Sequence, residues 1–370
     1  MGALLASLAI YFLTQGGSST SASSSSTAGD AVAAEKPLST DLALAFPSWN
    51  AESASLRELV AFVEDVCDPA SPNYKEPRDR IATFDMDGTI ISEKAPFYLD
   101  YMLLIHRVLD DPNHKSDAAT VAIIEQVRDN ALQGKKDSSL SAARHAASDA
   151  EFAGMTPEEF HAYINDFLDT TDVVGFDGMT YGGSFYKPMR EVIQFLRANE
   201  FDVFIVSACN REIARGVVER LDIEPDHVVG ADIAYASTKQ GEQDPTKFNM
   251  GQDEDVVLSV PLNENCEKTG KPLAIAREID KRPVLAFGNS SGDYGMLNYA
   301  EASGGMAFLV VADDVEREYG DAEKAAEIYK TVADEQWTSF SMKDDWATIY
   351  GEGVVKTELP AVEEELAQAA

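Results

Sequence analysis

The segment Asp85-Met86-Asp87-Gly88-Thr89 carries the clearest chemical signal in this chain of 370 residues. It follows the apolar run Arg80–Phe84, which is typical of a buried parallel strand. Carboxylates at the carboxyl end of such a strand lie at the edge where α/β sheets bind ligands. The first carboxylate could attack phosphorus in line, and the second could protonate a leaving oxygen and later deprotonate water. A calcium loop is excluded, because it needs glycine sixth and glutamate twelfth, whereas Gly88 is fourth and Pro96 is twelfth.

Two further polar elements follow in chain order. The strand-like run Phe204–Val206 ends at Ser207, whose hydroxyl could hydrogen-bond a phosphate oxygen. Lys271 opens a predicted helix and could hold a cation against the nucleophile and the transferring group. Lys268 lies three residues earlier and is the alternative lysine.

A fourth element is the polar loop Gly288–Asp293, which follows the apolar run Pro283–Phe287. This loop offers oxygen ligands to a hard divalent cation, and Mg²⁺ prefers few protein carboxylates together with phosphate and water oxygens. Each element alone is commonplace. Four of them in one order, each where a parallel strand should end, predict one shared site.

The elements that would position these residues alternate between strands and helices on both sides of residues 95–180. That block holds helical patterns and no convincing strand, so it interrupts the alternation. We therefore predict an α/β fold with a Rossmann-like parallel sheet, helices on both faces and an inserted α-helical cap domain. The predicted strands are Arg80–Phe84, Phe201–Val206, Val228–Tyr235 (extended), Pro283–Phe287 and Met306–Val311. The predicted helices are Ser55–Val66, Phe97–Val108, Ala118–Asn130, Pro157–Leu168, Lys187–Ala198, Arg211–Leu221, Pro272–Ile279 and Glu316–Val332.

The predicted domain boundaries follow from this pattern. Residues 37–91 and 184–350 form the α/β core, residues 92–183 form the helical cap, and residues 351–370 form an acidic tail that ends in a frayed helix. Residues 1–36 are a signal-like or anchor-like segment and a flexible linker, outside the fold.

The N-terminal segment decides the expected location. Its apolar run Ala3–Leu13 is shorter than the roughly 20 residues that a membrane-spanning helix needs, but it has the length of the apolar part of a signal peptide. We expect an extracytoplasmic protein, whether periplasmic, secreted or anchored at its N-terminus. The alternatives are a disordered tail and a cytoplasmic protein of a high-salt organism.

The composition limits the possible partners. Of the residues, 64 are acidic and 30 are basic, which gives a net charge of −34. Such a surface repels nucleic acid and anionic membranes, so we expect no nucleic-acid partner and membrane contact at most through the N-terminal segment. It also favours a soluble monomer or dimer. Three scattered cysteines exclude a disulfide framework, and the five histidines show no zinc-binding spacing.

As a set, the four elements resemble the haloacid dehalogenase (HAD) superfamily of phosphohydrolases, over about residues 80–300. Within it, the chain resembles the phosphoserine-phosphatase-like branch, which places a helical cap between its first two motifs. A finer resemblance is to a group of exported HAD hydrolases. It rests on Phe46–Asn50, Arg80–Thr89, Tyr186–Met189, Leu196–Asn199, Arg282–Leu297 and Ser341–Trp346.

The resemblance implies a role for each motif residue. Asp85 would be the nucleophile that becomes an aspartyl-phosphate, and Asp87 would be the general acid and base. Ser207 would orient the phosphoryl group, and Lys271 would neutralise charge.

The resemblance also implies a Mg²⁺ cofactor. The ion would be held by Asp85, the backbone carbonyl of Asp87 and Asp293, with Asn289 nearby. Many superfamily members have aspartate where this chain has Asn289, which could weaken its metal affinity.

Substrate contacts are less well defined. We expect Glu93, Thr89 and Asn210 to bind substrate, although the spacing of Glu93 does not clearly match the cap-side glutamate of phosphoserine phosphatases. Specificity for phosphoserine is therefore not implied. Further candidates in the cap are the arginines Arg107, Arg128 and Arg144.

The leading hypothesis is a Mg²⁺-dependent phosphatase that hydrolyses a small phosphorylated metabolite through an aspartyl-phosphate. Because a halide leaves without a proton, the presence of Asp87 favours an alkoxide leaving group over dehalogenation. Two alternatives remain. One is a phosphotransferase or mutase on the same scaffold, and the other is a non-catalytic protein that binds a phosphorylated ligand.

Overall fold

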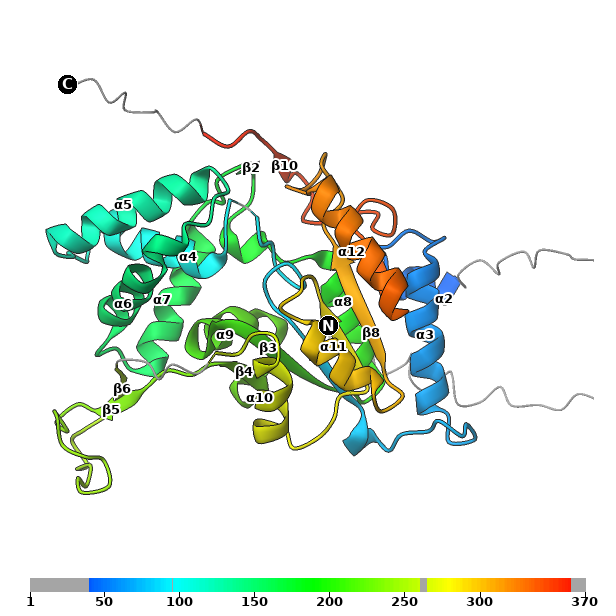
Figure 1. Ribbon diagram of the computed structural model, residues 1–370, viewed down its shortest axis with the longest axis horizontal. Coiled ribbons are helices and arrows are strands. Elements are labelled where there is room, and N and C mark those ends of the chain that lie inside the picture. Colours follow the sequence, from blue (N-terminus) through cyan, green and yellow to red (C-terminus); the bar gives the residue numbers. More distant parts are fainter. Residues whose placement is uncertain (1–39, 95, 260–264, 361–370) are drawn as a thin grey trace, which may run out of the picture.

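The structure is a computed structural model, and it describes residues 40–94, 96–259 and 265–360. Six parallel strands form the central sheet in the order β4-β3-β1-β7-β8-β9 (Figure 1). Their bounds are β1 Ile81–Phe84, β3 Asp202–Asn210, β4 Val228–Ala231, β7 Leu285–Gly288, β8 Met306–Val311 and β9 Thr338–Ser341. The α/β fold with a Rossmann-like parallel sheet is confirmed.

Aromatic rings run across the middle of this sheet. The rings of Phe84 and Phe287 stack with centroids 4.2 Å apart, Phe287 lies 5.1 Å from Phe308, and Phe308 lies 4.9 Å from Phe340. These four residues come from neighbouring strands, and all are fully buried. Side chains alternate along a strand, so Ala286, which precedes Phe287, faces the opposite side of the sheet, as do the residues on either side of Phe308. The stacked rings therefore form one continuous apolar layer across β1, β7, β8 and β9.

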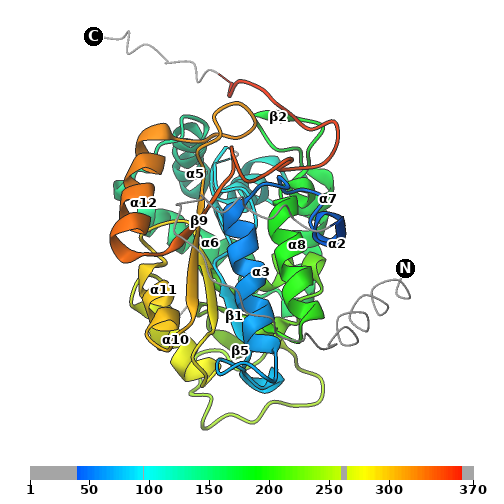
Figure 2. The same cartoon turned by 90° about the vertical axis from the view of Figure 1, so that its right-hand side faces the viewer.

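Helices cover both faces of the sheet (Figure 2). On one face lie α3 (Ala54–Cys67) and α8 (Lys187–Ala198), and on the other lie α10 (Gly270–Glu278), α11 (Tyr294–Glu301) and α12 (Ala322–Glu335). Helix α3 begins at Ala54 because the Ser53 hydroxyl accepts a hydrogen bond from the Leu56 amide, which caps its first turn. The short α2 (Thr40–Ala45) precedes α3.

Four further helices lie between β1 and β3 in the chain. They are α4 (Leu99–Ile105), α5 (Ala118–Leu132), α6 (Ser141–Phe152) and α7 (Pro157–Thr170), and they gather beside the sheet edge (Figure 1). Thr156 and Glu159 form a capping box at the start of α7, as their spacing predicts. Helix α7 packs on α9 (Arg211–Val218) at Gly216, where a Cβ atom would come within 2.8 Å of Ile164. The close packing holds this helix against the core.

Two small antiparallel sheets complete the described part of the chain. Strand β2 (Phe176–Asp177) pairs with β10 (Val355–Lys356), and β5 (Tyr235–Ser237) pairs with β6 (Val256–Leu258). The pairing of β10 means that this part of the predicted acidic tail lies against the segment that precedes α8.

Most predicted elements are present, with shifted ends. Met306–Val311 and Lys187–Ala198 have the predicted bounds. The helix predicted to begin at Glu316 begins instead at Ala322, because Asp321 caps it by accepting from the amides of Glu323 and Lys324. The extended run Val228–Tyr235 is divided between β4 and β5, and the helix predicted from Phe97 begins at Leu99. The elements that were not predicted are the helices α2, α6 and α11 and the strands β2, β6, β9 and β10.

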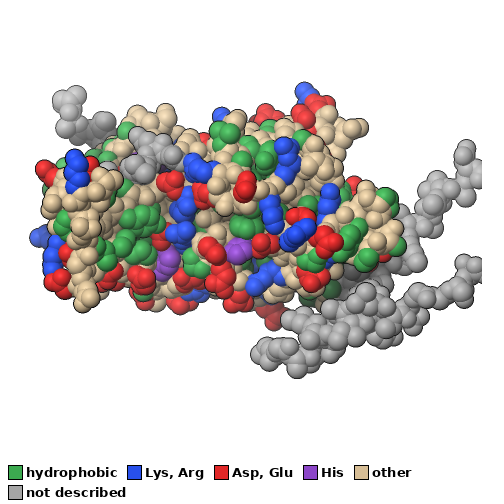
Figure 3. Space-filling view, turned by 90° about the horizontal axis from the view of Figure 1, so that it is seen from below, with side chains coloured by type: hydrophobic (Ala, Val, Ile, Leu, Met, Phe, Trp, Pro, Cys, Tyr) green, Lys and Arg blue, Asp and Glu red, His purple; other side chains and the backbone are tan. Residues whose placement is uncertain are grey.

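The N-terminal predictions, on residues 1–36, and the predicted frayed helix at the C-terminal end lie outside the described residues. The structure does not test the predicted domain boundaries, which stay predictions. No helix of the described ranges is long and apolar enough to cross a membrane. On the face seen in Figure 3, acidic side chains are spread widely with basic ones between them.

Candidate active site

The two carboxylates of the first motif leave the sheet at its centre. Strand β1 lies between β3 and β7, and the order of the strands along the sheet reverses there. Open α/β sheets bind ligands at such a point, beyond the carboxyl ends of the strands, and Asp85 lies at that end of β1. The Asp85 amide donates to the Phe287 carbonyl (2.9 Å), which extends the pairing of β1 and β7 into the loop. Gly88 then turns the chain with φ +79°, a conformation that side chains with a Cβ rarely adopt.

Lys271 joins two of the motif carboxylates. Its Nζ lies 2.5 Å from Asp85 Oδ1 and 2.7 Å from Asp293 Oδ1, and it donates to the Val206 carbonyl (2.6 Å). The side chain is buried, with 1% of it exposed, because α10 presents it into the sheet edge from its first turn. Lys268 is exposed and has φ +55°. Lys271 is therefore the lysine that contacts Asp85.

Asp293 also organises the loop that carries it. Its Oδ2 accepts hydrogen bonds from the backbone amides of Asn289 and Ser290, each at 3.0 Å. The Asp293 side chain packs so closely on Gly288 that a Cβ there would come within 2.5 Å of it. Asp293 thus fixes the loop after β7 and the lysine together.

Ser207 and Asn210 lie at the carboxyl end of β3, and Thr89 lies in the loop that follows β1. The Ser207 hydroxyl accepts from the Cys209 amide (3.0 Å), and the Asn210 carboxamide oxygen caps α9 by accepting from the Glu212 amide (2.9 Å). The Thr89 hydroxyl donates to Asp85 Oδ2 (3.3 Å). Thr89 is fully buried and does not line the cavity described next, so the structure does not bring it to a substrate. It orients Asp85 instead.

A cavity of about 620 Å³ lies over these loops. We call it the central cavity. Asp85, Asp87, Ser207, Lys271 and Asp293 form its floor. Its wall includes three more of the predicted site residues, Glu93, Asn210 and Asn289. Apart from Thr89 and two of the candidate arginines, the structure thus brings every predicted site residue to one cavity.

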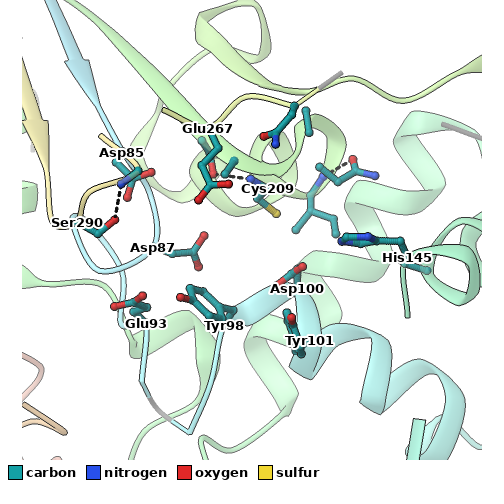
Figure 4. A pocket seen from close by; sticks show the side chains of 18 of the residues that line it. Asp85, Asp87, Glu93, Tyr98, Asp100, Tyr101, His145, Cys209, Glu267 and Ser290 are labelled. Atoms are coloured by element: carbon teal, nitrogen blue, oxygen red, sulfur yellow. Dashed lines mark hydrogen bonds between the residues drawn. The ribbon is translucent and has the colours of Figure 1, made fainter. Parts of the chain in front are cut away.

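The helical segment supplies the opposite wall of the central cavity. Figure 4 shows Asp87, Glu93, Tyr98, Asp100 and Tyr101 around the same space. Sequence reasoning did not find the last three. No local motif marks them, because they become neighbours of Asp87 only through the packing of α4 over the loop.

Only one of the three candidate arginines reaches the central cavity. Arg144 on α6 donates to Asp100 Oδ2 (3.0 Å), and its guanidinium carbon lies 3.8 Å from the centroid of the Tyr101 ring. Arg107 binds Asp111 and Arg128 binds Asp129, away from the cavity wall. The charge of Arg144 is therefore already matched by a carboxylate.

Burial and mutual repulsion shape the ionisation of the floor. Burial and the nearby Asp293 carboxylate raise the pKa of Asp85 to about 7, against the opposing effect of the Lys271 ammonium. Burial, together with the charges of Asp100, Asp85 and Glu93, raises the pKa of Asp87 well above its ordinary range. Asp87 Oδ1 is buried without a hydrogen-bond partner among the described residues. A protonated Asp87 is thus poised to donate to a group that enters the cavity.

The donor set fits Mg²⁺. The floor offers oxygen ligands, and its carboxylates exceed the single ammonium of Lys271, so a divalent cation would offset the surplus charge. Among the residues that the structure describes, no three or more His, Cys, Asp or Glu side chains form a metal cage of their own.

A comparison with protein families agrees with this fold. Residues 82–298 match the family described as haloacid dehalogenase-like hydrolase. The match covers more than half of the chain, so the protein belongs to this family and is a hydrolase. A search of curated proteins found no match.

Solved structures with related folds were also found. A Bordetella pertussis Tohama I protein of unknown function is 12% identical, with a TM-score of 0.46, over 70% of this chain and 97% of that one. A phosphoserine phosphohydrolase-like protein from Francisella tularensis is 16% identical, with a TM-score of 0.38, over 67% and 92%. Cytosolic 5′-nucleotidase IIIB bound to cytidine is 13% identical, with a TM-score of 0.45, over 79% and 86%.

Proposed function

We propose that the protein is a Mg²⁺-dependent phosphatase that hydrolyses a small phosphomonoester through an aspartyl-phosphate at Asp85. One observation carries the proposal: the buried Lys271 ammonium holds the Asp85 carboxylate at the floor of a cavity that Asp87 also lines. A nucleophile, a cation beside it and a second carboxylate in the same space are the groups that phosphoryl transfer to a carboxylate requires.

The chemistry divides between the two aspartates. Asp85 forms a bond to phosphorus while the bond from phosphorus to the leaving oxygen breaks, and Asp87 gives its proton to that oxygen. Asp87 is then ionised and takes a proton from water, whose oxygen attacks the aspartyl-phosphate and releases phosphate. Ser207 and Lys271 hold the phosphoryl oxygens in line during both steps.

The residues that would hold Mg²⁺ are Asp85, the Asp87 carbonyl, Asp293 and Asn289. When bound, the ion would neutralise negative charge on the carboxylates and on the phosphoryl group. The wall formed by α4 and α6 would exclude water and select the leaving group.

The proposal is tested by measuring phosphate release from an aryl phosphate and from a panel of phosphorylated metabolites, with Mg²⁺ and with a chelator. We expect turnover that requires Mg²⁺ and that Asp85→Asn abolishes, while Asp244→Asn, on an exposed loop, retains it. Turnover by Asp85→Asn at the parental rate would remove the nucleophile assignment. Phosphate transfer to an added alcohol in place of release would identify a phosphotransferase, and binding without turnover would identify a non-catalytic protein.

A further inference from the structure

The side chains of Asn289 and Glu93 meet at the edge of the central cavity. Asn289 Nδ2 donates to Glu93 Oε2 at 3.2 Å, although the residues are 196 positions apart. Both are 8% exposed. Asn289 follows β7 and Glu93 lies between β1 and α4, so this contact joins the loop after β7 to the segment that leads into the helical wall.

The contact uses only one end of the Asn289 carboxamide. An amide group has a nitrogen that donates and an oxygen that accepts, and the two point in different directions. Because the Asn289 amide nitrogen is hydrogen-bonded to Glu93, the amide oxygen is the atom that can bind another partner in the cavity that Asn289 lines.

The neighbouring carboxylate of the same loop is already engaged. Asp293 Oδ1 binds Lys271, and Asp293 Oδ2 accepts from the amides of Asn289 and Ser290. Asn289 Oδ1 can therefore add a second side-chain oxygen from this loop to the Asp293 carboxylate of the proposed Mg²⁺ site.

We propose that Glu93 is a positioning residue, which binds the nitrogen of the Asn289 carboxamide so that its oxygen is presented to the divalent cation. The proposal rests on the Mg²⁺ site of the proposed function, and it gives Glu93 a different role from the substrate contact expected from the sequence. Groups that orient a metal ligand through its far atom commonly change metal affinity 10- to 100-fold when they are removed.

The surroundings keep both partners in place. Tyr98 hydrogen-bonds to Glu93 from the helical wall, and Lys324 Nζ on α12 lies 3.9 Å from Glu93 Oε2. The Asn289 amide packs over Gly88, where a Cβ atom would come within 1.9 Å of Nδ2. Glu93 is thus held as an acceptor, and Asn289 has little room to move away from it.

The experiment measures Mg²⁺ affinity of the metal-free protein by calorimetry, which does not depend on turnover. We expect Glu93→Ala to weaken binding about 10- to 100-fold. Glu93→Gln, which keeps an acceptor and loses the charge, should remain within about threefold of the parent. A matched control is Glu267→Gln, which removes a carboxylate from the exposed rim of the same cavity and should leave the affinity unchanged.

A second background separates orientation from charge. A carboxylate has two equivalent oxygens and needs no orienting partner, so Glu93→Ala should not weaken Mg²⁺ binding when Asn289→Asp is also present. Equal weakening in both backgrounds, or no weakening by Glu93→Ala alone, would overturn the proposal.

If the parent binds Mg²⁺ in this Glu93-dependent way but releases no phosphate, the proposed function fails and this inference stands. If the parent turns over phosphate esters while Glu93→Ala binds Mg²⁺ as the parent does, only the inference fails.

Discussion

The Nζ atom of Lys271 lies 2.5 Å from Oδ1 of Asp85, although 186 residues separate them in the chain. The same ammonium binds Asp293 at 2.7 Å. One buried cation therefore serves two buried carboxylates, and its removal would leave both without a charged partner.

We predict that Lys271→Met destabilises the fold by about 3–5 kcal/mol, because it leaves carboxylates buried without their cation. It should also abolish phosphate release. The free energy of unfolding from urea denaturation checks the first effect, with Lys268→Met as the control at an exposed lysine. Equal stability of the two variants would mean that the Lys271 contacts contribute little to folding.

A second prediction concerns the leaving group. Asp87→Asn removes the proton donor, so we expect a loss of about 10²–10⁴-fold in kcat/KM for an alkyl phosphate, whose alkoxide needs that proton. The loss should be much smaller for p-nitrophenyl phosphate in the step that forms the aspartyl-phosphate, because its phenolate leaves without help. A rapid-mix measurement of p-nitrophenol release isolates this step. An equal loss for both substrates would argue against Asp87 as the general acid.

A third prediction separates strain from crowding at Gly88. Alanine at a positive φ costs roughly 1–2 kcal/mol wherever it occurs. At Gly88 its Cβ would also lie 1.9 Å from Asn289 Nδ2, whereas at Gly134, with φ +64°, it would meet no atom within 4 Å. Gly88→Ala should therefore be less stable than Gly134→Ala by a further 1–3 kcal/mol or so and should lose at least about tenfold in activity. Thermal unfolding and phosphate release measured side by side would show otherwise if the two variants behaved alike.

The residues at the carboxyl ends of strands could be predicted from the sequence because the reasoning there is local. Asp85, Ser207 and Asp293 each follow an apolar run, and parallel strands bring such ends to one edge. Lys271 was predicted by its place at the start of a helix. The order of the strands places all four around one point.

The wall of the cavity could not be predicted in the same way. Asp100 on α4 and Arg144 on α6 pair across 44 residues, and no local motif marks either residue. Helix α6 is rich in alanine and serine with few large apolar residues, so its pattern gave no clear helix. Strand β9 is an edge strand of only four residues, two of them serine, and within the sheet it pairs with β8 alone. Tertiary packing, rather than local preference, decides these elements.

The sequence also does not show in which direction the Thr89 side chain points. Its position in the motif suggested a substrate contact, but a side chain in a tight loop can turn inward as easily as outward. Its hydroxyl donates to Asp85 Oδ2 from a fully buried position. Only coordinates distinguish these two directions.

A last prediction concerns pH and a group away from the site. Glu318 is buried, accepts hydrogen bonds from the Tyr350 hydroxyl and the Tyr319 amide, and has its pKa raised to about 7 by burial. The folded protein therefore binds this proton more tightly than the unfolded chain does. The resulting stability is fully present below pH 4.5, the ordinary pKa of glutamate, and is lost as pH rises toward 7.

Glu318→Gln removes this dependence, because its amide keeps the hydrogen-bonding capacity without a charge. We expect the stability of the variant relative to the parent to rise by up to about 3 kcal/mol between pH 4.5 and pH 8. Urea denaturation at a series of pH values measures the difference, and taking the difference cancels the titration of the many other carboxylates. Glu242→Gln, at an exposed glutamate, should give a curve parallel to that of the parent. If the Glu318→Gln curve is also parallel, the Glu318 carboxyl does not gain its proton in this range, and the Tyr350 hydroxyl stabilises its ionised form despite burial.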